Sequence, residues 1–121
     1  FYEKDELCKK ILAQYLNHFE FPFEVSIFGD FFERKEIRRR DLIINTSGEH
    51  MEDIIKMKHY FKGNPVVAIQ SNDYFGLDEH INCVHNVEEL IEKNQIKNVV
   101  YKGELDFPKY TRYMTIGHWY V

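Results

Sequence analysis

Cysteine is scarce in this chain of 121 residues, which contains only Cys8 and Cys83. Two cysteines are too few for the disulfide framework of a small secreted domain. Both stand among apolar neighbours, so we expect small core residues. Runs of about 20 apolar residues are missing, which argues against a membrane-spanning helix, and no signal peptide is visible. These absences predict a cytoplasmic protein without a membrane partner.

The signatures of catalysis and cofactor binding are missing as well. The chain has neither the G-x-x-x-x-G-K-[ST] nor the G-x-G-x-x-G motif, and no G-x-S-x-G motif surrounds Ser47. None of the six histidines forms an H-x-x-x-H pair, and no cysteine pair has metal-ligand spacing, so we expect no metal site and no cofactor. The sequence indicates no catalytic residue. It leaves enzyme activity open and favours a protein without it.

Positive charge is not in excess, because the net charge is −4, whereas nucleic-acid-binding domains are usually basic. One basic run exists, and acidic residues lie within and beside it. The run consists of Arg34, Lys35, Arg38, Arg39 and Arg40, and the acidic residues are Glu33, Glu36 and Asp41. We expect a solvated segment, with an anion or partner contact as the alternative, and no direct nucleic-acid contact by this domain.

The composition, 44% hydrophobic and 30% charged, is typical of a globular protein, and the length fits a single domain, 1–121. Since the first residue is Phe1 rather than Met, we treat the chain as a domain or fragment that a longer protein can contain. The clearest helix is "DELCKKILAQYLNHF", because its apolar residues recur at i, i+3 and i+4. They are Leu7, Cys8, Ile11, Leu12, Tyr15, Leu16 and Phe19.

Segments typical of strands alternate with helical ones along the rest of the chain. "FEVSIF" predicts a half-buried strand, and "DLIINT" and "PVVAIQS" predict strands buried in a parallel sheet. "NVEE" begins a short helix, and "INCV" and "KNVVYKGEL" are candidate strands. We predict an α/β fold, namely a small three-layer, doubly wound, mainly parallel sheet of about four strands. An irregular or β tail, or an edge strand, completes it at 105–121.

The turn "NTSG" is the candidate ligand site, comprising Asn45, Thr46, Ser47 and Gly48. It follows a predicted strand, and the carboxyl ends of parallel strands are where ligands bind in such sheets. Thr46 and Glu49 have the spacing of a capping box, which predicts a helix that begins here. Structural capping is the main interpretation. Binding of a phosphate-type ligand at the helix N-terminus is the alternative.

The tail "KYTRYMTIGHWYV" combines aromatic and basic residues, the types that are enriched at protein interfaces. The candidate interface residues are Tyr110, Arg112, Tyr113, Trp119 and Tyr120. The alternatives are packing of the tail onto the domain's own sheet and, more remotely, stacking on single-stranded bases. We expect a homodimer or another protein partner.

Three segments carry a resemblance: "HFEFPFEVSIF", "DLIINTSG" and "NPVVAIQSND". Their order, within roughly Leu7 to Asp73, resembles the enzyme IIB-like domain of the sugar phosphotransferase system, in the degenerate form at the C-terminus of Mga-type transcriptional regulators of Gram-positive bacteria. The resemblance implies a four-stranded parallel sheet with helices on both faces. It also implies a regulatory role coupled to oligomeric state or phosphotransferase signals, with DNA bound by separate domains.

The chain departs from that family at the phosphorylated cysteine, which follows the first strand of true enzyme IIB domains. Neither Cys8 nor Cys83 occupies that position, so no phosphoacceptor is carried over. We therefore expect a non-catalytic regulatory and self-association domain of a bacterial transcriptional regulator. The alternatives are a fragment of a nucleotide-sugar or phosphate-handling enzyme, such as a glycosyltransferase, and a nucleic-acid-binding module acting through Arg38–Arg40 or the tail.

Overall fold

The computed structural model describes residues 1–22, 29–33 and 37–121. They belong to two compact units, Phe1–Glu36 and Ile37–Val121, each of which is described by itself. The first unit contains helix α1 (Glu6–Leu16), which confirms the predicted helix. Its N-terminus is capped by Asp5, whose side chain accepts a hydrogen bond from the amide of Cys8 at 2.9 Å. The predicted strand at 23–28 lies outside the described residues.

No residue of α1 is buried. Cys8 is exposed, so its prediction as a core residue was wrong, whereas Cys83 is buried as predicted. The helical period correctly predicted an apolar stripe along α1. Such a stripe does not specify which other element packs against it. A short 3₁₀ helix, η1 (Phe31–Glu33), follows in the same unit.

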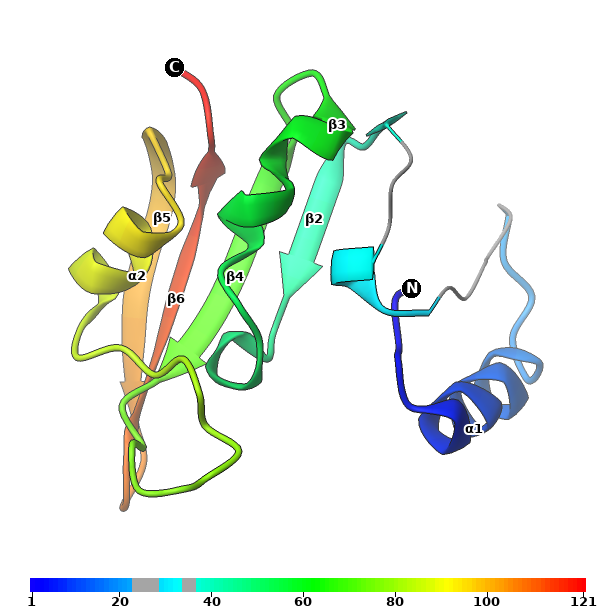
Figure 1. Cartoon of the computed structure of the whole chain (residues 1–121), viewed down its shortest axis with the longest axis horizontal. Coiled ribbons are helices and arrows are strands. Elements are labelled where there is room, and N and C mark those ends of the chain that lie inside the picture. Colours follow the sequence, from blue (N-terminus) through cyan, green and yellow to red (C-terminus); the bar gives the residue numbers. More distant parts are fainter. Residues whose placement is uncertain (23–28, 34–36) are drawn as a thin grey trace. The chain divides into compact units, whose positions relative to one another are not determined.

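The second unit is built on a four-stranded sheet in the order β2-β4-β6-β5 (Figure 1). The strands are β2 (Leu42–Asn45), β4 (Val66–Asn72), β5 (Asn98–Asp106) and β6 (Thr111–His118). β2 and β4 are parallel, and β6 is antiparallel to both β4 and β5. The α/β class is confirmed, but the sheet is mixed rather than mainly parallel. The reason is the tail, which turns back after β5 and inserts as β6 beside β4.

The remaining strands are β1 (Arg38–Arg39) and β3 (Phe61–Lys62), which form a separate parallel pair. β4 is buried as predicted. β2 is not buried on both faces as predicted, because it is an edge strand. Ile43 points into the core while its neighbour Ile44 is exposed. The segment "INCV" is not a strand but part of the loop 73–86.

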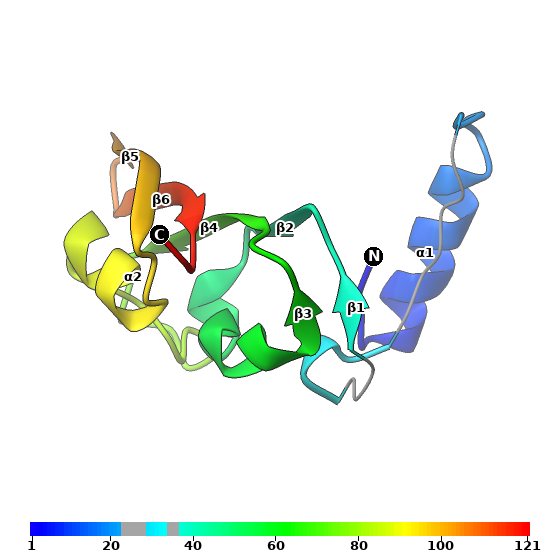
Figure 2. The same ribbon diagram turned by 90° about the horizontal axis from the view of Figure 1, so that it is seen from above.

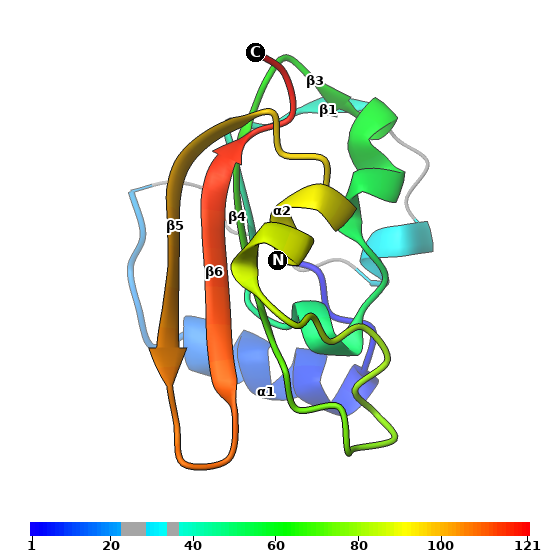
Figure 3. The ribbon, with the colours of Figure 1, turned by 90° about the vertical axis from the view of Figure 1, so that its left-hand side faces the viewer.

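The helices of the second unit lie on one face of the sheet (Figures 2 and 3). Helix α2 (Val87–Lys93) packs on β5 and β6 and confirms the short helix predicted at "NVEE". The side chain of its N-cap, Asn86, accepts a hydrogen bond from the amide of Glu89 at 2.8 Å. Between these helices and the sheet lies the core. Its most deeply buried members include Ile54, Val67, Ile69, Val84, Thr115 and Trp119.

No helix within 37–121 covers the opposite face of the sheet (Figure 2). Because side chains alternate along a strand, the register of the four strands assigns the residues that share this face. Its apolar members are Leu42, Ile44, Val66, Ala68, Tyr101, Leu105, Met114 and Ile116, and we call them the open face. Among the described residues, no helix has the length and apolar character needed to cross a membrane.

The capping box predicted at Thr46 and Glu49 is not formed. Instead of one α-helix, two 3₁₀ helices follow β2, namely η2 (Gly48–His50) and η3 (Ile54–Tyr60). A side chain at Gly48 would collide with the backbone carbonyl of Gln70, so the turn is held tightly against β4. The side-chain amide of Asn82 donates at 2.9 Å to the carbonyl of Met51, which holds the extended segment that separates the two helices.

Replacing Ile69 by Ala should destabilise the second unit by about 2–5 kcal/mol, because a side chain 1% exposed leaves a cavity in the centre of the sheet. Ile81→Ala is the matched control, since Ile81 is 67% exposed and its replacement should change the free energy of unfolding by no more than about 1 kcal/mol. Chemical denaturation measures both. Equal effects would contradict this placement of β4 at the centre.

Candidate functional site

The candidate site lies where β2 and β4 both end, at the lower end of the sheet in Figure 1. Two segments meet there: the turn after β2, with η2, and the loop 73–86 after β4. The amide of Asn82 in that loop donates at 3.0 Å to the carbonyl of Glu49 in η2. This is the end of the parallel pair at which α/β sheets place ligands.

The predicted ligand residues Asn45, Thr46, Ser47 and Gly48 build the turn itself. Asn45 Oδ1 accepts a hydrogen bond from the amide of Ser47 at 3.0 Å, which is an Asx turn. The carbonyl of Thr46 accepts a hydrogen bond from Arg112. Ser47 is the N-cap residue of η2, but its side chain makes no capping hydrogen bond. These contacts favour the structural interpretation of the turn over the phosphate-type ligand.

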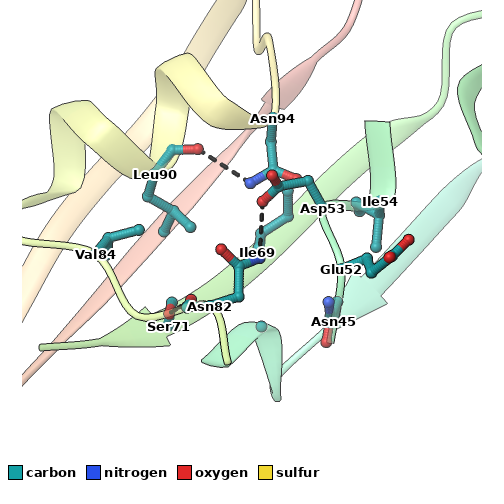
Figure 4. Close-up of a pocket in the computed structure, with 11 residues that line it drawn as sticks. Asn45, Glu52, Asp53, Ile54, Ile69, Ser71, Asn82, Val84, Leu90 and Asn94 are labelled. Carbon is teal, nitrogen blue, oxygen red and sulfur yellow. Dashed lines mark hydrogen bonds between the residues drawn. The ribbon is translucent and has the colours of Figure 1, made fainter. Parts of the chain in front are cut away.

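A small cavity adjoins the turn, with Asn45 and Gly48 among its lining residues (Figure 4). Its volume is about 10 Å³, roughly the space of one water molecule. Asn94 lines it and has a buried Oδ1 without a partner, which a single water would satisfy. Nucleotides and sugar phosphates need pockets of roughly 300 Å³ or more. The cavity therefore gives no support to the nucleotide-sugar alternative.

Arg112 on β6 is held at this end of the sheet by three contacts within the domain. Its Nε donates to Gln70 Oε1 at 2.8 Å, and its Nη1 donates to Glu49 Oε1 at 3.2 Å. Its Nη2 donates to the carbonyl of Thr46. The Glu49 side chain is 7% exposed, so the pair with Arg112 is a largely buried ion pair. Arg112 therefore stabilises the domain internally, and its role as an interface residue stays a prediction.

Two histidines lie next to this ion pair. The rings of His50 and His80 meet edge to face, with centroids 4.7 Å apart. Glu49, His50 and His80 each offer one ligand atom, and these atoms all lie within 4.8 Å of one another. The sequence prediction of no metal site did not anticipate this cluster, because it tested only short spacings. The available signal was that both histidines closely follow predicted parallel strands.

Cys83 lies beside the cluster, and its thiol donates to Asn72 Oδ1 at 3.4 Å. Burial raises the pKa of the thiol above its ordinary value, and the nearby carboxylates of Glu49 and Asp73 raise it further. The thiol is therefore protonated at neutral pH. A protonated, buried thiol is a poor nucleophile, which agrees with the absence of a carried-over phosphoacceptor.

The predicted interface residues of the tail separate into buried and accessible ones. Tyr113 and Trp119 are buried, so their prediction as partner contacts was wrong. The Tyr113 hydroxyl donates to the carbonyl of His85 at 3.0 Å, and the ring of Trp119 lies 5.8 Å from that of Phe61. Tyr110 is half-buried, and Tyr120 is exposed beneath the ammonium of Lys58. The tail thus packs mainly onto its own sheet.

Comparisons with known proteins leave the family open. A scan against protein-family models finds no match, and a search of curated proteins finds no relative.

Arg112→Met should cost about 3–5 kcal/mol of folding stability, because it leaves the carboxylate of Glu49 buried without its partner. Adding Glu49→Gln to that variant should recover part of the loss, with a coupling of roughly 0.5–3 kcal/mol. Arg39→Met is the matched control. Arg39 pairs with Asp41, but both side chains are more than 80% exposed, so the change should be below about 1 kcal/mol. Denaturant titration of the native chain, Arg112→Met, Glu49→Gln, the double variant and Arg39→Met measures these values, and additivity of the two changes would contradict the pairing.

Proposed function

We propose that this chain is a non-catalytic regulatory and self-association domain of a bacterial transcriptional regulator, similar to the enzyme IIB-like C-terminal domains of Mga-type regulators. In this proposal the protein is cytoplasmic, and other domains of the regulator bind DNA. The observation that carries the proposal is the open face of the sheet. The protonated thiol of Cys83 and the small cavity support the absence of a phosphotransfer step at the described residues.

The open face presents apolar side chains from all four strands. Leu42 and Leu105, on the two edge strands, are 53% and 61% exposed. Large exposed apolar patches on otherwise polar domains mark interaction surfaces. Burying apolar surface contributes about 25 cal/mol per Å² to the free energy of association. A partner that covers this face therefore buries apolar side chains of all four strands and binds more tightly for each.

A second copy of the chain is the occupant that the charges of this face favour. Ala68, Met114 and Ile116 form its centre, and none of them is charged. The one charged side chain that the register assigns to this side of the sheet is Arg112, and Glu49 pairs with it. Two such faces can therefore meet about a two-fold axis without repulsion between like charges, at the roughly 10 Å spacing of face-to-face sheets.

The three-layer, doubly wound arrangement of the enzyme IIB-like family has helices on both faces of the sheet. The helices of the second unit supply one outer layer, and the sheet supplies the middle layer. In the proposed dimer, the sheet of the second copy takes the place of the other helical layer, so the two copies stack as helices, sheet, sheet and helices. This assembly accounts for a sheet whose second face is apolar, which an antiparallel or mixed sheet facing water would not need.

Ile44→Asp should weaken self-association at least tenfold, about 1.4 kcal/mol, because it places a carboxylate in the apolar contact. Ile81→Asp is the matched control: the same substitution, at a residue of the loop 73–86 with nearly the same exposure, 67% against 64%. Light scattering over a concentration series measures the mass of each protein, and circular dichroism checks that both variants fold. The native chain should reach twice the monomer mass.

Two results would contradict the proposal. One is a native chain that remains monomeric at every concentration, which would favour the ligand-handling alternative. The other is an Ile44→Asp variant that associates as well as Ile81→Asp, which would move the contact away from the open face.

A further inference from the structure

The cluster at the carboxyl ends of β2 and β4 combines two imidazoles and one carboxylate. Glu49 and His50 come from η2, and His80 comes from the loop after β4, so three ligands of two types converge from two neighbouring segments. Their ligand atoms lie within 4.8 Å of one another. Two imidazole nitrogens and one carboxylate oxygen are a common three-ligand set of zinc sites that keep a fourth position open.

The hydrogen bonds of both histidines leave Nε2 of each ring available to bind a metal. His50 Nδ1 lies 3.1 Å from the carbonyl of Glu79, and His80 Nδ1 lies 2.7 Å from the carbonyl of Tyr74. Since a carbonyl only accepts hydrogen bonds, each Nδ1 carries the proton and each neutral ring keeps its lone pair on Nε2. Backbone carbonyls hold metal-binding histidines in this same tautomer and orientation.

Glu49 supplies a second, independent observation. Its side chain is 7% exposed, and Arg112 occupies one carboxylate oxygen, Oε1. The other oxygen, Oε2, is buried without any hydrogen-bond partner. A buried, unsatisfied carboxylate oxygen is costly, and a cation bound next to it removes that cost. His50 Nε2 lies 3.9 Å from Oε1 of the same carboxylate, the oxygen that Arg112 also contacts.

We propose that Glu49, His50 and His80 bind one Zn²⁺ ion, with a water in the open fourth position. Imidazole ligands favour zinc over magnesium and calcium, which prefer oxygen. Zinc bonds of about 2.0–2.2 Å require the ligand atoms to move closer together. His50 can make this movement because 43% of its side chain is exposed. The positive charge of Arg112 opposes the cation, so the site is weaker than a closed four-ligand zinc site.

Zinc binding to the full chain, freed of metal by a chelator, tests the proposal by isothermal titration calorimetry with ZnCl₂. The native protein should bind one Zn²⁺ per chain, and His50→Ala and His80→Ala should each weaken binding at least tenfold. His59→Ala is the matched control, since His59 is exposed in η3 and stacks on Tyr60 outside the cluster. Its affinity should equal that of the native chain. Both cluster histidines are accessible, so their variants should fold, which circular dichroism checks.

Substitution with Co²⁺ gives a second readout, because tetrahedral Co²⁺ absorbs visible light far more strongly than the aqueous ion. The native chain and His59→Ala should show this band, and His80→Ala should lose it. The proposal is overturned if the native chain binds no Zn²⁺, if all three histidine variants bind alike, or if Mg²⁺ binds as tightly as Zn²⁺. The test uses none of the open-face residues, so its outcome is independent of self-association.

Discussion

The pairing of β4 on both of its edges is the constraint on which the second unit depends. β4 is parallel to β2 on one side and antiparallel to β6 on the other, and Val67 and Ile69 are almost completely buried. Because its backbone is satisfied by two neighbours and one face is covered by helices, every other element is placed relative to it. The turn at Gly48 fits tightly against the carbonyl of Gln70, and the register puts Arg112 of β6 beside the same end of the strand.

The parts of the fold that could be predicted are those with a local cause. β4 is a continuous apolar run between Pro65 and polar residues, and Asn86 caps α2 with its own side chain, so short segments of sequence contain the whole signal. The position of β6 has no such local cause. Its alternation fits an edge strand as well as an inner one, and the choice is made by pairing with β4, whose residues lie 40 to 52 positions earlier in the chain.

The candidate site shows the same division between local and distant causes. The location of the turn at Asn45 could be predicted because it ends a strand. Its hydrogen bond from Arg112 to the carbonyl of Thr46 could not be predicted, because Arg112 follows Thr46 by 66 residues. The capping-box pattern at Thr46 is a real local preference worth about 1 kcal/mol. It is overridden by the close packing of Gly48 on β4, which imposes a 3₁₀ turn.

Two of the departures from local rules among the described residues differ in kind. At the end of β4, a carboxylate is buried with one oxygen paired to Arg112 and the other left without a partner. Across the sheet, apolar side chains such as Ile44 are left in water. Natural sequences depart from consistent design chiefly where function requires it. The proposed zinc ion would relieve the first departure, and the proposed second copy would relieve the second. Because these two partners differ, we expect metal binding and self-association to be gained or lost separately.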